Sequence, residues 1–144
     1  MTLTIAPAET AQDRAACFAL RDAVFVEEQG VSKEEEYDGR DGAARHLLAR
    51  LHGTPAGTLR MRVVDDAVKL ERVCVARAVR GRGIGAALTR AALDMAREMP
   101  GVRAARLGAQ VPVIGFYERL GFTAHGPEYL DAGIPHRDMT RPLP

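Results

Sequence analysis

Apolar residues recur at regular intervals along the chain, and these intervals predict its helices and strands. Thr10 and Asp13 have the spacing of a helix-capping pair. The apolar residues that follow them recur at helical spacing and predict an amphipathic helix that ends near Phe25 or Val26. Short apolar runs bounded by Gly, Pro or Asp predict strands instead. These runs cover residues 3–6, 44–52, 58–64, 68–75, 104–109, 122–125 and 136–140.

Three further segments have the pattern of helices. Ser32 and Glu35 have the spacing of a capping box and predict a short helix. Apolar positions at helical spacing over residues 84–99 predict a second helix, which ends at Pro100. The same spacing over residues 112–120, with a proline at the start, predicts a third helix.

The connections predict how the strands pair. Short turns, among them Gly53–Gly57, join the strands between residues 44 and 75, which indicates an antiparallel meander. The next unit is strand, helix and strand, so residues 104–109 are expected parallel to residues 68–75. A loop over Gly126–Pro135 is expected between the last two strands. The chain is therefore predicted to be an α/β protein with a mixed sheet, in which an antiparallel meander precedes a parallel β-α-β crossover.

Composition and charge narrow the class of protein. A chain of 144 residues suits one domain, over residues 1–144. A net charge of +1 provides no general attraction to nucleic acid or to anionic membranes, and neither is expected as a partner. The sequence lacks a membrane-spanning run and a signal-peptide pattern, so a cytoplasmic protein is expected. Cys17 and Cys74 are expected to be buried free thiols, and no metal-ligand spacing is present.

An acidic segment over Glu27–Asp41 has two interpretations. It contains seven acidic residues, with Lys33 and Arg40 as its basic residues. A charge run of this kind is usually a solvated helix and loop. It could also form a wall that attracts a cationic amine. The sequence leaves both interpretations open.

A glycine-rich loop lies between the strand over residues 68–75 and the helix over residues 84–99. The loop consists of Arg80, Gly81, Arg82, Gly83, Ile84, Gly85 and Ala86. Its glycines leave backbone N–H groups accessible, and the helix start adds free N–H groups and the positive end of the helix dipole. Arg80 and Arg82 add donors that suit phosphate oxygens. The loop therefore predicts a site for the diphosphate of a nucleotide-like cofactor.

Two other phosphate-binding motifs fit the loop poorly. A Walker-type nucleotide loop needs Gly-Lys-Ser/Thr, whereas Gly85 is followed by Ala86 and Ala87. A dinucleotide-binding fingerprint needs an acidic residue about 20 positions further on, and the strand over Arg103–Gln110 has none. The meander before the loop is also unlike a doubly wound sheet. An NAD(P)-dependent oxidoreductase is therefore the less favoured alternative.

The loop, together with two other segments, resembles the GNAT acetyltransferase superfamily. Arg80–Ala86 is similar to the family's coenzyme A loop, Gln/Arg-x-x-Gly-x-Gly/Ala. Leu70–Ala76 resembles the family's fourth strand, and Phe116–Phe122 resembles its FYxxLGF signature. The resemblance covers essentially the whole chain. Residues 20–30 and 132–136 are similar to a small bacterial branch of uncharacterised single-domain acetyltransferases.

The resemblance implies acetyl-CoA as cofactor and a set of binding residues. Backbone groups of the loop would hold the diphosphate. Val73, Cys74 and Val75 would form the strand edge that pairs with the pantetheine arm, and one of their N–H groups would face the thioester carbonyl. Many family members have an asparagine after the fifth strand, where this chain has Gln110. The family transfers the acetyl group directly, so Cys74 is not expected to be a nucleophile.

Two residues are the main candidates for proton transfer. Tyr117 would protonate the leaving thiolate, although its place on an apolar helix face also suits the core. Glu71 shares a face with Val73 and Val75 and would deprotonate the amine, or it would pair with a basic residue on the next strand. Weaker candidates for the acceptor pocket are Glu28, Tyr37, Asp38, His46 and His136.

The sequence thus predicts an acetyl-CoA-dependent N-acetyltransferase. Its partner would be an amine on a small molecule or a peptide, and the identity of this acceptor stays open. An acetyl-CoA-binding sensor with little turnover is the alternative within the same fold. Small domains of this kind often pair, which leaves a homodimer open.

Overall fold

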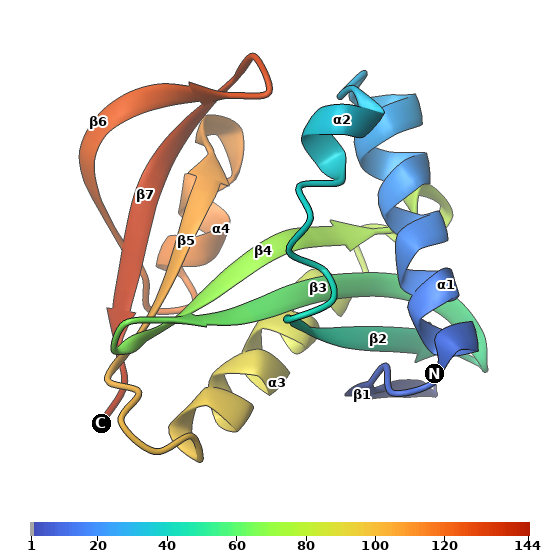
Figure 1. Cartoon of the computed structure of the whole chain (residues 1–144), viewed down its shortest axis with the longest axis horizontal. Coiled ribbons are helices and arrows are strands. Elements are labelled where there is room, and N and C mark those ends of the chain that lie inside the picture. Colours follow the sequence, from blue (N-terminus) through green and yellow to red (C-terminus); the bar gives the residue numbers. More distant parts are fainter. Residues whose placement is uncertain (1) are drawn as a thin grey trace.

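The computed structural model describes residues 2–144, which fold around one seven-stranded mixed sheet of order β1-β2-β3-β4-β5-β7-β6 (Figure 1). The strands are β1 (Leu3–Pro7), β2 (Arg45–Leu51), β3 (Thr54–Val64), β4 (Ala67–Val75), β5 (Ala104–Gln110), β6 (Thr123–Asp131) and β7 (Ile134–Pro142). The α-helices are α1 (Ala11–Arg21), α2 (Lys33–Glu36), α3 (Ile84–Arg97) and α4 (Ile114–Glu118). Shorter helical segments are the π-helix η1 (Asp22–Glu28) and the 3₁₀ turns η2 (Arg77–Val79) and η3 (Val111–Val113).

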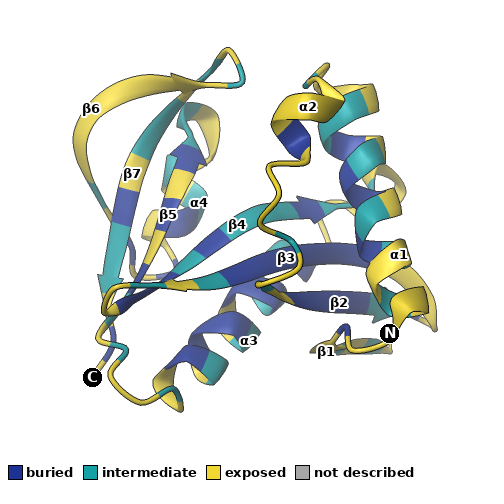
Figure 2. Ribbon diagram, viewed as in Figure 1, coloured by how far each residue is buried: buried dark blue, intermediate teal, exposed yellow. Residues whose placement is uncertain are grey.

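The helices cover the sheet on both faces. The helix α3 packs under β1–β4, and α1 lies on the opposite face of the sheet, over β2–β4 (Figure 1). Successive residues of a strand point to opposite faces, so Leu47 joins the core under α3 while Leu48 joins the smaller core under α1. Figure 2 shows that burial is concentrated on the central strands and on the inner side of α3. Each described helix is too short or too polar to span a bilayer.

The predicted meander and crossover are both present. The strands β2, β3 and β4 pair antiparallel, and β5 runs parallel to β4. The parallel pairing is confined to the start of the two strands, from Ala67 with Ala104 to Lys69 with Arg106. Beyond these pairs β4 and β5 diverge, and this divergence positions the site described below.

The turn predicted over Gly53–Gly57 is wrong. The chain reverses at His52 and Gly53, which have φ angles of 52° and 82°, and β3 begins at Thr54. The proline in this segment, Pro55, pairs with Arg50 beside a register shift that leaves one residue of β3, Ala56, without a partner in β2. Prolines are tolerated at such irregular positions because the regular hydrogen-bond ladder is already interrupted there.

The loop predicted over Gly126–Pro135 is also wrong. The strands β6 and β7 continue to a tight turn at Ala132 and Gly133, with φ angles of 51° and 75°. A register shift between His125 and Tyr129 absorbs Gly126 and the following proline. Because β6 is the edge strand, this proline interrupts no pairing with a further strand.

Candidate active site

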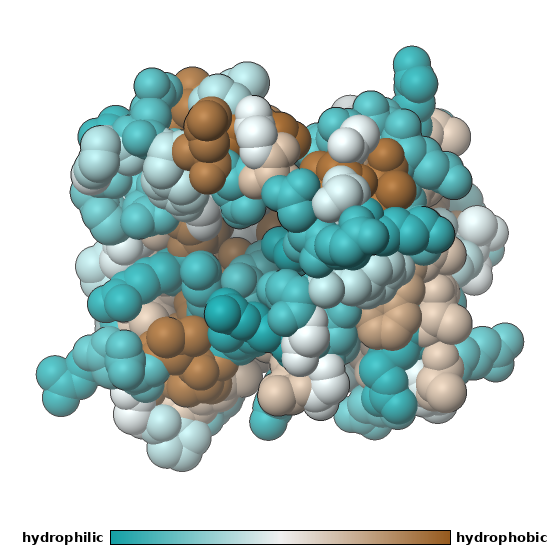
Figure 3. All heavy atoms as spheres, turned by 45° about the horizontal axis from the view of Figure 1, so that its top comes forward, coloured by the Kyte–Doolittle hydropathy of each residue, from teal (hydrophilic) through white to brown (hydrophobic). Residues whose placement is uncertain are grey.

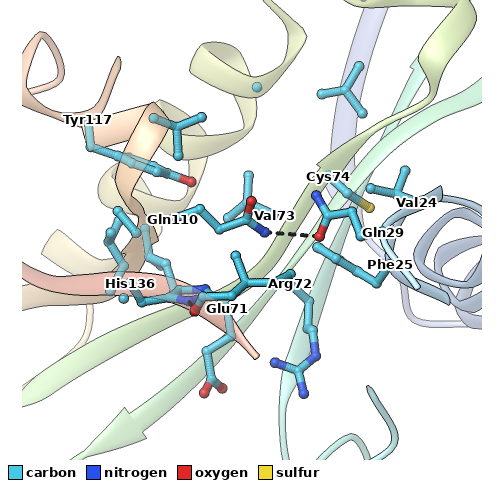
Figure 4. A pocket seen from close by; sticks show the side chains of 18 of the residues that line it. Val24, Phe25, Gln29, Glu71, Arg72, Val73, Cys74, Gln110, Tyr117 and His136 are labelled. Atoms are coloured by element: carbon cyan, nitrogen blue, oxygen red, sulfur yellow. Dashed lines mark hydrogen bonds between the residues drawn. The ribbon is translucent and has the colours of Figure 1, made fainter. Parts of the chain in front are cut away.

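The divergence of β4 and β5 opens a cavity of about 660 Å³. Its walls come from the C-terminal halves of these two strands and from the glycine-rich loop, α4 and the β6–β7 hairpin. The segment around η1 and α2 forms the remaining wall. The space-filling view shows the hollow between the β6–β7 side and the α1–α2 side of the molecule (Figure 3). Figure 4 shows the side chains that enter it.

The structure brings nearly all predicted site residues to this cavity. Both catalytic candidates, Tyr117 and Glu71, lie in its wall. So do the cofactor candidates Val73, Cys74, Val75, Arg80, Gly81, Gly83, Ile84, Gly85, Ala86 and Gln110. Arg82 is the exception, because it belongs to the same loop but is exposed beside the cavity.

The loop has the backbone shape of an anion site. Gly81 and Gly83 both have a φ angle of 80°, a conformation that favours glycine. A Cβ added at either position would meet no atom within 4 Å, so backbone conformation rather than packing calls for glycine there. Gly83 is the N-cap of α3, and the first turn of a helix has N–H groups without helical partners. Ile84, Gly85 and Ala86, which form this first turn, line the cavity.

The side chain of Arg80, which the sequence suggests as a phosphate ligand, lies in the cavity wall and contacts other residues of the chain. Its guanidinium forms two hydrogen bonds with Glu28, at 2.5 and 2.8 Å, and its Nε donates to the carbonyl oxygen of Val75 at 3.0 Å. The hydrogen bond from Arg80 lowers the pKa of Glu28. In this structure Arg80 therefore ties the loop to the end of η1.

Gln110 is also engaged by a partner that the sequence did not indicate. Its amide nitrogen donates to the side-chain oxygen of Gln29 at 3.0 Å, and this bond crosses the cavity (Figure 4). Gln29 follows η1, and π-helical segments are frequent at functional sites. The two residues are 81 positions apart, so no local pattern could have paired them.

The strand β4 contains a bulge where it forms the cavity wall. Arg60 pairs with Glu71 and Thr58 pairs with Cys74, so two residues of β4 stand opposite one residue of β3. Such a bulge leaves one residue without a regular ladder partner and redirects the strand. Burial raises the pKa of the Cys74 thiol to about 12, which disfavours the reactive thiolate.

Tyr117 combines a buried ring with a hydroxyl in the cavity. The side chain is 8% exposed, and its ring makes edge-on contacts with Phe116 and Phe122. Figure 4 shows the hydroxyl pointing toward Gln110. Burial raises the pKa of Tyr117 to about 12, so the phenol keeps its proton at neutral pH and can donate a hydrogen bond.

Glu71 lies in the wall, but its carboxylate is occupied. Arg60 and Arg62 approach it to 3.0 and 2.5 Å. Burial alone would raise the pKa of Glu71, but the hydrogen bond from Arg62 and the neighbouring positive charges outweigh it, and the net pKa is lowered. Figure 4 shows the carboxylate pointing away from Tyr117 and Gln110. A carboxylate held in this way is a weak proton acceptor.

His136 is the weaker candidate that reaches the cavity with a suitable ring atom. Its Nδ1 lies 2.6 Å from the carbonyl oxygen of Ile134, which places the ring proton on Nδ1 and leaves Nε2 as the acceptor. The ring stacks on Tyr129, whose hydroxyl donates to Asp138 at 2.7 Å. Tyr129 also lines the cavity, and no sequence pattern had indicated it.

The other weaker candidates have different places. Glu28 belongs to the pair with Arg80. Tyr37, Asp38 and His46 lie outside the cavity wall. Tyr37 donates to Asp22 at 2.7 Å, and Asp38 accepts from Arg60 at 2.8 Å.

Three of the seven acidic residues in the acidic segment pair with buried arginines. Arg60 has no exposed surface and pairs with Asp38 and Asp41, while Arg21 is 1% exposed and pairs with Glu36 and Asp41. These acids hold the segment after α1 against the sheet and are therefore not free to attract a cation. Within residues 2–144 no group of three or more His, Cys, Asp or Glu residues could hold a metal ion.

Comparison with known proteins agrees with this geometry. Residues 7–143 match the sequence model of the acetyltransferase (GNAT) domain, and the chain belongs to this family. A Bacillus subtilis protein, whose name describes an acetyltransferase without a stated substrate, is 39% identical over 133 residues that cover 90% of each chain.

Solved structures show the same fold over nearly the whole chain. An acyl-CoA N-acyltransferase from Pseudomonas aeruginosa has a TM-score of 0.85 and 33% identity, over 97% of this chain and 98% of that one. Escherichia coli ElaA has a TM-score of 0.86 and 29% identity, over 97% of this chain and 99% of ElaA. The mixed sheet with a single crossover is therefore a GNAT sheet, and the doubly wound alternative does not apply.

Proposed function

We propose that this protein is an N-acetyltransferase that moves the acetyl group of acetyl-CoA directly to a primary amine. The observation that carries the proposal is the meeting of three parts in one cavity: an anion-binding loop, an irregular strand edge and a tyrosine hydroxyl. Membership of the acetyltransferase family and the similarity to an acyl-CoA N-acyltransferase support it.

The residues present fit such a cofactor. The loop N–H groups from Ile84 to Ala86, at the positive end of α3, would bind the diphosphate. The edge of β4 from Val73 to Val75 is separated from β5 and can pair with the pantetheine arm as with another strand. When bound, acetyl-CoA supplies an acetyl group activated as a thioester.

The reaction makes separate demands on this chain. The amine nitrogen forms a bond to the acetyl carbon, the carbon–sulfur bond breaks with its electron pair on sulfur, and the amine gives up a proton. We assign to the N–H of Val73, at the bulge, the role of hydrogen-bond donor to the carbonyl oxygen of the thioester. This bond would stabilise the negative charge that develops on the oxygen. Backbone donors of this kind are already in place before the reaction and need no rearrangement.

We assign to Tyr117 the role of stabilising the sulfur atom that leaves as coenzyme A. With a pKa near 12, it holds its proton more tightly than a thiol of pKa about 8.5. Full proton transfer to the sulfur is therefore uphill, and the hydroxyl stabilises the thiolate by donating a hydrogen bond instead. This refines the role that the sequence suggested.

The proton acceptor for the amine is assigned to Nε2 of His136 rather than to Glu71. The Glu71 carboxylate is paired with two arginines and its pKa is lowered, whereas the contact of His136 with Ile134 leaves Nε2 free to accept. The amine substrate would pass its proton to His136 directly or through a water molecule.

Thiol release from acetyl-CoA, measured against a panel of polyamines, amino acids, aminoglycosides and peptides, tests the proposed function. We expect at least one amine to accelerate thiol release and to gain the mass of an acetyl group. Binding of acetyl-CoA without acceleration by any amine would favour the sensor. Absence of binding would contradict both functions.

A further inference from the structure

Arg72 has an unusual backbone conformation for a residue inside a strand. Four non-glycine residues among residues 2–144 have a positive φ angle, and three of them lie in the turns of hairpins: His52, Asp65 and Ala132. Arg72 is the fourth, with a φ angle of 56°, and it lies within β4. The left-handed conformation is unfavourable for a residue with a side chain, so other contacts must maintain it.

The strained residue coincides with the bulge in the cavity wall. Arg72 and Val73 together stand opposite a single residue of β3, and both line the cavity. The conformation of Arg72 therefore determines the direction of the next peptide group, which carries the N–H of Val73. A rotation at Arg72 would therefore change the direction of this N–H group in the cavity wall.

The side chain of Arg72 is fixed by a segment far away in the sequence. Its Nε forms an ion pair with a carboxylate oxygen of Glu36 at 2.7 Å, although the N–H is not aligned for a hydrogen bond. Its Nη2 donates to the carbonyl oxygens of Glu36 and Glu35, at 3.1 and 3.3 Å, and lies 3.6 Å from Asp38. Figure 4 shows this side chain leaving β4 on the side away from Tyr117 and Gln110, so it does not itself point at the reacting groups.

The anchor for Arg72 is itself immobilised. The side chain of Glu36 is 2% exposed, and its second oxygen lies 3.1 Å from Arg21, which is 1% exposed. Arg21 is held in turn by Asp41 at 2.7 Å and stacks against Phe18. The chain of contacts thus runs from the core of α1 through α2 to the bulge.

We propose that Arg72 is a positioning residue that fixes the β4 bulge and aims the N–H of Val73 at the thioester carbonyl. The inference rests on the proposed function. It adds that the segment around α2 controls the carbonyl-binding geometry through the contact of Glu36 with Arg72. The unfavourable backbone conformation is maintained by this contact rather than by the strand ladder.

The carbonyl stretching band of carbon-13-labelled acetyl-CoA, measured by infrared spectroscopy, tests this inference without an amine acceptor. Hydrogen bonding to the carbonyl oxygen lowers the band frequency, so binding to the unaltered protein should lower it relative to free acetyl-CoA. In Arg72→Gly the backbone conformation becomes free of strain but the anchor is lost. We expect the shift to disappear and the Kd for acetyl-CoA to rise roughly fivefold, as for one lost hydrogen bond. The Kd for coenzyme A, which lacks the carbonyl, should stay within about twofold.

Two further variants separate positioning from folding. Asp65→Gly makes the same change at a φ angle of 55° in the β3–β4 turn, outside the cavity, and should retain the shift. Arg72→Lys keeps the charge, but an ammonium group lacks the planar fork of donors that reaches the Glu36 carboxylate and the carbonyl oxygens of Glu35 and Glu36. This variant should show a partial shift of the carbonyl band. Melting temperatures of all variants report any loss of folding.

The outcomes of these measurements are distinct. A full band shift in Arg72→Gly, or an equal loss in Asp65→Gly, would overturn the role of Arg72 and leave the proposed function intact. An unaltered protein that binds acetyl-CoA with no band shift would overturn the assignment of Val73 and the inference with it. Failure of the unaltered protein to bind acetyl-CoA would contradict the proposed function itself.

Discussion

At the scale of single residues, Tyr117 has an apolar environment around its ring and an open cavity at its hydroxyl, and both matter for its proposed role. Its ring is packed against Phe116, at a centroid distance of 4.9 Å, and its hydroxyl opens on the cavity. The packing fixes the position of the hydroxyl before any ligand binds. The sequence could predict both properties, because they follow from an apolar helix face and a short family motif.

Tyr117→Phe removes the hydroxyl and leaves the ring. We expect kcat to fall about tenfold to hundredfold, the value of one hydrogen bond to a developing charge, with an unchanged Kd for acetyl-CoA. Thiol-release kinetics and calorimetry measure the two quantities. Tyr37→Phe is the matched control, because that hydroxyl bonds Asp22 outside the cavity. An unchanged kcat would remove Tyr117 from the mechanism.

His136→Gln tests the proton acceptor. The variant removes the ring nitrogen that would take the proton from the amine, so we expect kcat/KM at neutral pH to fall about a hundredfold, with an unchanged Kd for acetyl-CoA. Thiol-release kinetics and calorimetry measure the two quantities. His125→Gln, which alters an exposed histidine bonded to Thr140, should keep the kcat/KM of the unaltered protein. If His136→Gln keeps it as well, another group accepts the proton.

At the scale of elements, the cofactor site is built by backbone conformation more than by side chains. The loop before α3 uses Gly81 and Gly83 in the left-handed conformation to present the helix start. The strand β4 uses a bulge, and β5 moves away after three paired residues. The loop could be predicted from its glycines. The bulge could not, since it depends on contacts with α2.

Gly83→Ala and Gly101→Ala form a matched pair for this element. Both glycines have φ angles near 80°, and a Cβ at either position would meet no atom within 4 Å. Each variant should lose about 1 kcal/mol of unfolding free energy from the left-handed conformation alone. Only Gly83→Ala should weaken acetyl-CoA binding, because Gly101 lies outside the cavity. Equal affinities in calorimetry would argue against the loop as the diphosphate site.

Contacts between distant elements limited the prediction from sequence. The loop residue Arg80 looked like a phosphate ligand, yet it is paired with Glu28, 52 positions away. Gln110 is likewise bonded to Gln29. Local patterns identify the element on which a residue lies, but the partner of a long polar side chain depends on how the elements pack.

At the scale of the whole molecule, buried charges hold the segment after α1 to the sheet. Arg60 has no exposed surface and contacts Asp38, Asp41 and Glu71 at 2.8–3.0 Å. Its hydrogen bond lowers the pKa of Asp38. For Asp41 and Glu71, burial alone would raise the pKa, but their arginine partners lower it overall. Burial raises the pKa of Glu36, which acts in the opposite sense.

These shifts predict loss of stability in acid. Groups with a folded pKa below the unfolded value of about 4 stabilise the protein fully above that pH and lose this contribution as pH falls through the folded value. We expect the free energy of unfolding, from urea titrations, to fall steeply below about pH 4. Arg60→Met should lose about 3 kcal/mol at pH 7 and flatten the acid dependence. Arg97→Met, which breaks an exposed pair with Asp94, should change stability by less than about 0.5 kcal/mol. A steep acid dependence retained in Arg60→Met would contradict this origin.

The overall arrangement was predictable because topology restricts it. A meander followed by a strand–helix–strand unit admits one right-handed crossover, and β5 lies beside β4 as expected. The extent of the parallel pairing was not predictable, because no residue of β4 or β5 marks where the ladder stops. That point determines where the cavity opens.

We propose that the cleft between β4 and β5, with the loop at its end, binds the thioester cofactor. Calorimetric titration of the protein with acetyl-CoA, and in parallel with NADPH, tests this assignment. We predict saturable binding of acetyl-CoA to one site per chain, weakened in Gly83→Ala, and no binding of NADPH. Binding of NADPH without binding of acetyl-CoA would contradict the assignment of this cleft to a thioester cofactor.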